Sequence, residues 1–386
     1  MLASRIRGGG PAEREVDRSF RCVFHPDPPP TTGKTDGTSA GFRTPRMNTA
    51  PTAPTADAAA NAGTWRRWHS EETPLRLGVS RCLLGEAVRF DGGHARDRFV
   101  TERLREWFTF VPVCPEMEIG LGAPRPSIRL VESEEGLRLV APSTGQDLTE
   151  RMQSYASDKV RDLQALDLDG FVLKKSSPSC GLERIRVYRN GAAVRSNETG
   201  LFAAQLRRDW PALPIEEEGR LRDPILREHF LERVFHRNRW RALNRQPLTR
   251  GRLVTFHTAH KLLIRAHDEA AYRQLGTLLG RAGQLPDEEL FARYELAFQH
   301  ALTRHATRRK HTNVLQHAMG HLKHELASPE REHLRTTIED YRRGWTALNV
   351  PLSLLRYEIQ RLEIPYLCDQ LYFEPHPREL MLRNHA

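Results

Sequence analysis

The sequence lacks the features that would mark a membrane or secreted protein. None of its apolar runs reaches the length that a bilayer span requires, and no hydrophobic segment resembles a secretory signal. The five cysteines are an odd number, which argues against a framework of disulfides. We therefore expect a protein of the reducing cytoplasm, with no membrane partner and no evident partner protein.

Lysine is also scarce. Arginine supplies most of the 59 basic residues, and the net charge is +10. The planar, bidentate guanidinium suits phosphates and nucleobases, so the composition is compatible with a nucleic-acid partner. It is equally compatible with an arginine-rich proteome, and the charge alone leaves both interpretations open.

The composition changes near residue 73. The segment before it is rich in proline, threonine, alanine and glycine, and it has too few apolar residues to offset chain entropy. We therefore predict that residues 1–73 form a disordered arm. Its arginines slightly resemble a transit peptide, but acidic residues are interspersed, and Met47 offers an alternative start.

Residues 74–218 alternate short apolar runs with amphipathic stretches. Strands are expected at residues 75–80, 110–113, 170–173 and 213–216, and helices at residues 98–108, 146–166 and 199–210. This alternation predicts an α/β domain with a mostly parallel sheet flanked by helices.

The rest of the chain is expected to be helical. Residues 219–252 carry ten arginines and a net charge of +7 over residues 220–252, and we predict a basic helical hinge there. Residues 253–386 show helical spacing of apolar positions and no convincing strand. The predicted fold class is therefore an α/β domain followed by an all-α C-terminal domain.

Three cysteines stand at or just after the ends of predicted strands, namely Cys82, Cys114 and Cys180. In open α/β sheets, ligands bind at that edge. Spacings of 32 and 66 residues match no short metal-finger pattern, so small buried cysteines remain an alternative interpretation. The neighbouring glycine, proline and polar residues favour loops that surround a ligand.

The segments around these cysteines resemble those of the thiouracil desulfidase family of TudS type, over roughly residues 75–215. The segments that carry the resemblance are Cys82-Leu83-Leu84-Gly85, Arg89-Phe90-Asp91-Gly92-Gly93-His94, Cys114-Pro115-Glu116, Pro124-Arg125-Pro126 and Ser177-Pro178-Ser179-Cys180-Gly181. Residues 253–386 resemble the helical YbgA-like domain, through residues 256–261, 312–317 and 375–380. This two-domain order is similar to that of the RudS-type tRNA thiouridine desulfidases.

The resemblance implies a [4Fe–4S] cluster held by Cys82, Cys114 and Cys180, which leaves the fourth iron open. The open iron would accept the sulfur of a thiocarbonyl while water adds to the carbon, without net electron transfer. The resemblance also implies that Glu116 activates water and that Ser177 binds or protonates near the reacting base. A turn residue at Ser177, and an ion pair of Glu116 with Arg125 or Arg129, are the structural alternatives.

Further candidates concern the substrate. We predict that Arg125, Lys175, Asp91 and His94 bind substrate at the open edge, the two cations through a nucleotide phosphate. The tRNA-binding candidates of the helical domain are Lys261, Arg308, Arg309 and Lys310, although the last three would equally suit a solvated helix end. The histidines at 317, 321 and 324 lie at helical spacing, but without the Glu of a metalloprotease motif they do not predict a metal site.

The predicted function is an iron–sulfur desulfidase that converts 4-thiouridine in tRNA to uridine. A desulfidase of free thiouracil or similar small thio-compounds is the alternative within enzymes. The alternative from another class is a non-catalytic module that binds RNA or a partner and is stabilised by zinc at the cysteines.

Overall fold

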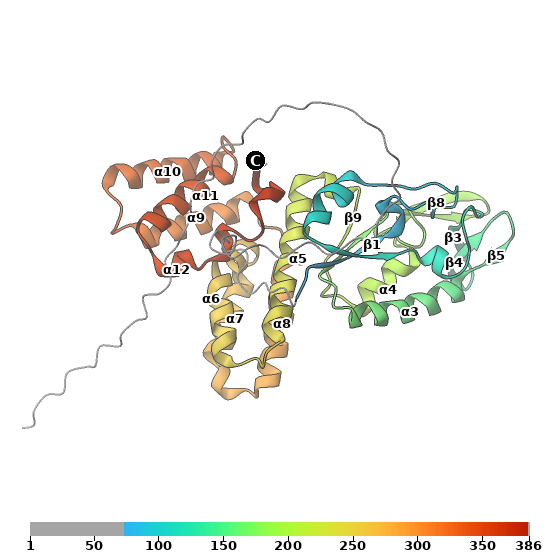
Figure 1. Cartoon of the computed structure of the whole chain (residues 1–386), viewed down its shortest axis with the longest axis horizontal. Coiled ribbons are helices and arrows are strands. Elements are labelled where there is room, and N and C mark those ends of the chain that lie inside the picture. The colour runs from blue at the N-terminus through green and yellow to red at the C-terminus, as the bar shows by residue number, and fades with distance from the viewer. Residues whose placement is uncertain (1–72, 385–386) are drawn as a thin grey trace, which may run out of the picture.

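The computed structural model describes residues 73–384, so the prediction of a disordered arm, with Cys22, falls outside the described part apart from Thr73. The α/β part occupies one end of the molecule and the helical part the other, with one long helix, α5, between them (Figure 1). The predicted order, an α/β domain followed by helices, is confirmed.

The parallel sheet consists of β1 (Arg76–Ser80), β2 (Thr109–Val113), β6 (Gly170–Leu173) and β9 (Ile215–Glu217). All three pairings are parallel, in the order β2-β1-β6-β9. The central strands are short apolar runs because both faces of the sheet are covered. The predicted mostly parallel sheet is therefore confirmed.

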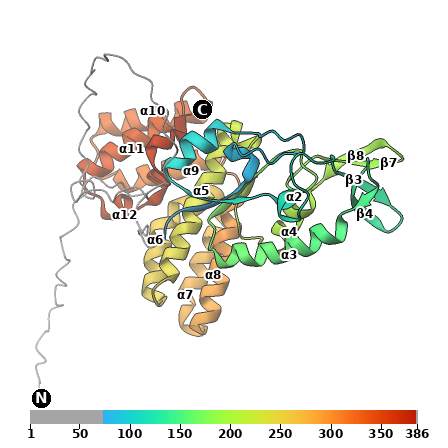
Figure 2. The ribbon, with the colours of Figure 1, turned by 45° about the vertical axis from the view of Figure 1, so that its right-hand side comes forward.

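Helices cover both faces of this sheet (Figures 1 and 2). On one face, α3 (Thr149–Ala165) and α4 (Leu201–Asp209) share a core with Phe171 and Leu173 of β6. On the other face, Phe230, Leu231, Val234 and Phe235 of α5 (Pro224–Asn244) pack with β1.

A second sheet was not predicted. Its strands are β3 (Arg129–Ser133), β4 (Gly136–Ala141), β5 (Gln146–Asp147), β7 (Ile185–Arg189) and β8 (Ala192–Glu198), and three of its four pairings are antiparallel. β3, β4 and β7 mix apolar with charged residues, and β5 and β8 are largely exposed, so the second sheet lacks the continuous apolar runs of buried parallel strands.

The segment predicted as a helix over residues 98–108 is helical but not α-helical. A π turn over Phe99–Arg103 is followed by a 3-10 turn over Leu104–Glu106. The apolar spacing cannot distinguish these helix types, because each brings residues three to five apart onto one face.

The segment predicted as a basic helical hinge is helical, and most of its helix α5 is buried. Its residues form a short turn at Arg220–Arg222, then α5, then the start of α6 (Arg250–His267). Arg237 donates to the Leu168 carbonyl at 2.9 Å, and Arg239 to the Pro375 carbonyl at 2.6 Å. Arginines that contribute to the net charge of +7 therefore bond to groups inside the protein.

The helical part contains α6 and then α7 (Glu269–Gly280), α8 (Asp287–Leu302), α9 (Arg308–Leu322), α10 (Ser328–Arg343), α11 (Asn349–Arg361) and α12 (Pro365–Cys368). Figure 2 shows α7 and α8 as a hairpin that projects from the body. The tail returns to α5, where Leu380 and Leu382 join the core of β1 and Arg383 bonds to Glu228 and Glu232. The two parts thus share a core. Within residues 73–384, no helix is long and apolar enough to cross a membrane.

Candidate active site at the edge of the parallel sheet

The three cysteines meet at the carboxyl edge of the parallel sheet, as predicted. β1 runs into a 3-10 turn that carries Cys82. β2 ends just before Cys114, which caps the short helix α2 (Pro115–Glu118). The loop after β6 brings in Cys180, and all three residues line one cavity of about 320 Å³.

Burial keeps these thiols protonated when no metal is bound. It raises the pKa of Cys82 to about 11, with a further increase from Cys114, while Lys174 opposes the shift. Burial likewise raises the pKa of Cys114 and of Cys180. Cys114 acts electrostatically on both other thiols, as expected of groups around one site. Metal binding here would release protons, because thiolates are the ligands.

The donor set fits an iron–sulfur cluster. Each described cysteine is a free thiol, and the three site cysteines are Cys82, Cys114 and Cys180. Between residues 73 and 384, no three His, Cys, Asp or Glu side chains converge on a single metal ion. A cluster needs instead one thiolate for each of several irons, spread around a cavity.

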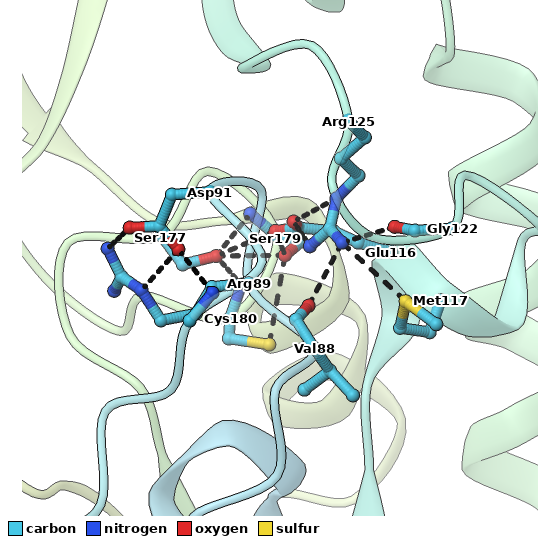
Figure 3. Close-up of polar contacts among 11 residues, drawn as sticks. Val88, Arg89, Asp91, Glu116, Met117, Gly122, Arg125, Ser177, Ser179 and Cys180 are labelled. Carbon is cyan, nitrogen blue, oxygen red and sulfur yellow. Dashed lines mark hydrogen bonds and ion pairs between the residues drawn. The ribbon is translucent and has the colours of Figure 1, made fainter.

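Glu116 is held from two sides beside the thiols (Figure 3). Its Oε1 accepts hydrogen bonds from Ser179 Oγ at 2.7 Å and from Ser177 Oγ at 3.2 Å. Its Oε2 accepts from Arg125 Nε at 3.1 Å and from Arg125 Nη2. The carboxylate is therefore fixed in orientation at the wall of the cavity.

Arg125 is buried and bonds to Glu116. Its side chain is only 3% exposed, and Nη1 donates to the carbonyls of Val88 at 2.9 Å and Gly122 at 2.6 Å. Its remaining nitrogens bond to Glu116. The expected ion pair of Glu116 with Arg125 is therefore present, and because Arg125 also lines the cavity, its binding of substrate stays a prediction.

Ser177 is a turn residue whose hydroxyl also contacts Glu116, and its catalytic role stays a prediction. Its Oγ accepts from the backbone N–H groups of Ser179 at 3.3 Å and Cys180 at 3.2 Å, as a turn residue does. The same hydroxyl contacts Glu116. The turn therefore holds Ser177 in place beside the carboxylate.

Ser179 was missed by the sequence reasoning. It is fully buried, and its Oγ bonds to Glu116 at 2.7 Å and lies 3.7 Å from Cys180 Sγ. A Cβ on Gly200 would lie 2.6 Å from the Ser179 carbonyl oxygen, so the close approach of the two loops requires glycine at position 200. In the sequence, Ser179 could have been identified as a polar residue that directly precedes Cys180 in the same motif.

The Asp-Gly-Gly-His loop positions Arg89, which the sequence reasoning did not select. Asp91 bonds to Arg89 at 3.1 Å and to the Gly93 N–H at 3.0 Å, and Arg89 lines the cavity. Gly92 has φ +74°, the left-handed region that glycine adopts easily. Asp91 and His94 are exposed and do not line the cavity. Asp91 therefore acts through Arg89.

Lys174 and Lys175 both line the cavity but differ in their surroundings. Lys174 Nζ bonds to Glu218 at 2.6 Å, and that carboxylate also accepts the Lys175 backbone N–H at 2.7 Å. The side chain of Lys175 is exposed. Lys175 is thus the lysine better placed for an anionic substrate, in line with the sequence prediction.

Three of the helical-domain candidates, Arg308, Arg309 and Lys310, form the start of α9, and Lys261 lies on α6. Lys310 Nζ donates to the carbonyls of His267 and His305, and Arg308 donates to the Tyr341 carbonyl at 3.3 Å. Arg309 is exposed, and Lys261 is half-buried on α6. Arg309 is thus the candidate with an exposed side chain, and the contact of these four residues with tRNA stays a prediction.

Comparisons with known proteins match the two parts to different families. Residues 77–218 match the family described as 2-thiouracil desulfurase, and residues 261–377 match a protein family of unknown function, DUF1722. The chain is 33% identical over 155 residues to the uncharacterized protein YbgA of Escherichia coli (strain K12), which covers 40% of this chain and 92% of that protein.

Two further similarities are weaker. The uncharacterized protein YbbK of Bacillus subtilis (strain 168) is 28% identical over 108 residues, 27% of this chain and 71% of that protein. A solved structure, described as [4Fe–4S]-dependent thiouracil desulfidase TudS, is 29% identical over 39% of this chain and 94% of its own, with a TM-score of 0.32. Both expected resemblances are confirmed: residues 77–218 match the 2-thiouracil desulfurase family, and through its helical part the chain belongs to the family of the YbgA protein.

Proposed function

We propose that this protein is a [4Fe–4S]-dependent desulfidase that removes sulfur from 4-thiouridine in tRNA and leaves uridine. The observation that carries the proposal is the cavity itself, where three free thiols from three strand ends surround a space beside an oriented carboxylate. The cluster would be held by the three site cysteines and would supply an open, thiophilic iron that polarises the C–S bond.

The protein's own residues would handle water and protons. Glu116 is positioned by Arg125 and Ser179 so that its carboxylate can accept a proton from an attacking water. Ser177 is within hydrogen-bond distance of the same carboxylate, at 3.2 Å, and could pass a proton between the reacting base and Glu116. Buried walls limit access of bulk water to the reacting carbon.

The positive charge around the cavity supports the proposal of an anionic, polymeric substrate. Arg89 and Lys175 place positive charge on the cavity wall, where a nucleotide phosphate would lie. The exposed Arg309 and the overall net charge of +10 add to this positive field. A free base would need none of these groups, whereas tRNA would gain affinity from each.

The direct test is anaerobic incubation of the cluster-loaded full chain with bulk tRNA, followed by nucleoside analysis. We expect 4-thiouridine to decrease and uridine to appear at its position, with the Cys180→Ala protein as the inactive control. Unchanged 4-thiouridine in the presence of an intact cluster would contradict the tRNA proposal. The full chain is required, because Leu380 and Leu382 belong to the core of β1 and a truncation before α6 would remove them.

Free thiouracil is the second candidate, favoured by the cavity of about 320 Å³, which falls in the size range of small-molecule sites. Parallel assays with 2-thiouracil and with free 4-thiouridine distinguish the two. Turnover of the free compounds at rates equal to or above that of tRNA would select the small-molecule reading.

A further inference from the structure

One loop supplies much of the site at the three cysteines. It joins β6 to β7 over residues 174–184, and we call it the cluster loop. It carries Cys180, Ser177 and Ser179, and the two hydroxyls contact Glu116 (Figure 3). The positions of one site cysteine and of both serines therefore depend on the contacts that fix this loop.

The cluster loop contains backbone conformations that need support. Ser176 and Arg184, near its two ends, both have φ +59°, although neither is glycine. This left-handed region is unfavourable for a residue with a Cβ, and such conformations persist where the surrounding contacts fix them. Each end of the loop is therefore expected to have specific contacts that hold it.

Glu218 holds the first end of the cluster loop. It directly follows β9, and its backbone N–H donates to the Leu173 carbonyl, at the end of β6, at 3.1 Å. Its side chain is 7% exposed. Oε2 accepts the Lys175 N–H at 2.7 Å, and Oε1 accepts from the Lys174 ammonium at 2.6 Å. The backbone is thus held one residue before Ser176.

Glu217 holds the second end. This last residue of β9 is buried, and its Oε1 accepts two backbone N–H groups, from Leu182 at 2.7 Å and from Glu183 at 3.3 Å. Leu182 lies two residues after Cys180, and Glu183 directly precedes Arg184. A single carboxylate oxygen therefore fixes the backbone between the site cysteine and the second left-handed residue.

Glu217 and Glu218 act on the site from outside the cavity. Neither residue lines the cavity at the three site cysteines, so neither would touch a ligand there. Successive residues at the end of a strand direct their side chains to opposite sides, which lets two neighbours reach the two ends of one loop. A buried carboxylate is unfavourable unless it is hydrogen-bonded, and backbone N–H groups of the cluster loop provide these bonds.

We propose that Glu217 and Glu218 are positioning residues of the site, each acting through one end of the cluster loop. Glu217 fixes the end that carries Cys180 and thereby controls how firmly the iron–sulfur cluster is retained. Glu218 fixes the end that leads to Ser177 and thereby controls the rate of turnover. Only the role of Glu218 in turnover rests on the proposed function, because cluster retention requires no substrate.

Cluster retention tests Glu217. Cluster-loaded full-length proteins are mixed anaerobically with an iron chelator, and the iron–sulfur absorption is followed at a temperature where circular dichroism shows each protein to be folded. We expect Glu217→Ala to lose the cluster about tenfold faster than the parental protein, the effect of one lost hydrogen bond to a carboxylate. Glu217→Gln should keep the parental rate, because its amide oxygen can accept both N–H groups.

The matched control is Asp147→Ala, which removes a carboxylate that accepts the Thr149 N–H at 2.8 Å in the second sheet. It should lose the cluster at the parental rate. The role of Glu217 would be overturned by a parental rate in Glu217→Ala, by equally fast loss in Asp147→Ala, or by faster than parental loss in Glu217→Gln.

Turnover tests Glu218. We expect Glu218→Ala to retain the cluster like the parental protein but to have a kcat about tenfold lower, on whichever of bulk tRNA and 2-thiouracil the parental protein uses. Glu218→Gln should recover most of this kcat, because its amide oxygen can accept the Lys175 N–H and Lys174 keeps its bond to the Lys175 carbonyl at 3.1 Å.

Three outcomes would overturn the role of Glu218. They are a parental kcat in Glu218→Ala, an equal fall in Glu218→Gln, and cluster loss in Glu218→Ala as fast as in Glu217→Ala. If the parental protein turns over neither substrate, the proposed function fails on its own. The chelator assay then still decides whether the two neighbouring carboxylates differ in their effect on the cluster, as the proposal requires.

Discussion

Replacing Arg125 by methionine removes one partner of the buried ion pair that orients Glu116. The Arg125 side chain is 3% exposed and that of Glu116 is 14% exposed, so water cannot readily replace the lost contact. The carboxylate would keep its hydrogen bonds from Ser179 and Ser177 but would lose both bonds from the guanidinium.

The expected cost follows from this geometry. Removing one partner of a buried ion pair destabilises a protein by about 3–5 kcal/mol, since the other charge stays buried without compensation. In the double variant Arg125→Met with Glu116→Gln, no charge remains. Only the carbonyls of Val88 and Gly122 lose a donor, which costs about 1–3 kcal/mol.

The assay is equilibrium urea unfolding of the four full-length proteins of this double-mutant cycle, followed by circular dichroism. We expect the double variant to be more stable than Arg125→Met alone by about 2 kcal/mol, so that the two changes do not add. Equal destabilisation by Arg125→Met in the presence and absence of the Glu116 charge would refute the reasoning, because the arginine would then act only through packing and the two carbonyls.

Three further predictions follow from the site and the helical core. Alanine at any one of the three site cysteines should abolish the broad iron–sulfur absorption near 400 nm and the activity, whereas Cys368→Ala, in the helical part, should keep both; a full iron content after Cys180→Ala would contradict the ligand assignment. Glu116→Gln and Ser177→Ala should retain the absorption and lose turnover by about 10²–10⁴-fold, and parental turnover in either variant would exclude its catalytic role. Burial lowers the pKa of His257 and of His376 to about 4. Because these values lie below the unfolded pKa, the stability from neutral histidine is present above about pH 6.5 and is lost as the pH falls toward 4. The loss at pH 5 is about 2 kcal/mol for each histidine. A urea midpoint that stays constant from pH 8 to pH 5 would contradict this predicted loss of stability.

The sequence by itself determined the parallel sheet and the position of the cysteines. Buried parallel strands are continuous apolar runs, so β1, β2 and β6 were recognisable locally, and β6 was predicted with its observed bounds. β9 contains two glutamates, and its strand was expected two residues earlier than it begins. Cysteines placed at the ends of parallel strands must converge, because those ends meet at one edge of the sheet. The convergence of the three site cysteines therefore followed from their positions at predicted strand ends.

Only the tertiary structure decided what each polar side chain does. Ser179 bonds to Glu116 across 63 residues of sequence, a separation over which local patterns carry no information. The burial of Arg125, and of Arg237 and Arg239 in the segment predicted as a basic helical hinge, gives these side chains internal partners that the sequence did not reveal. An arginine on a helix or loop looks the same in sequence whether it meets solvent or a carbonyl, because its partner is chosen by the packing of distant elements.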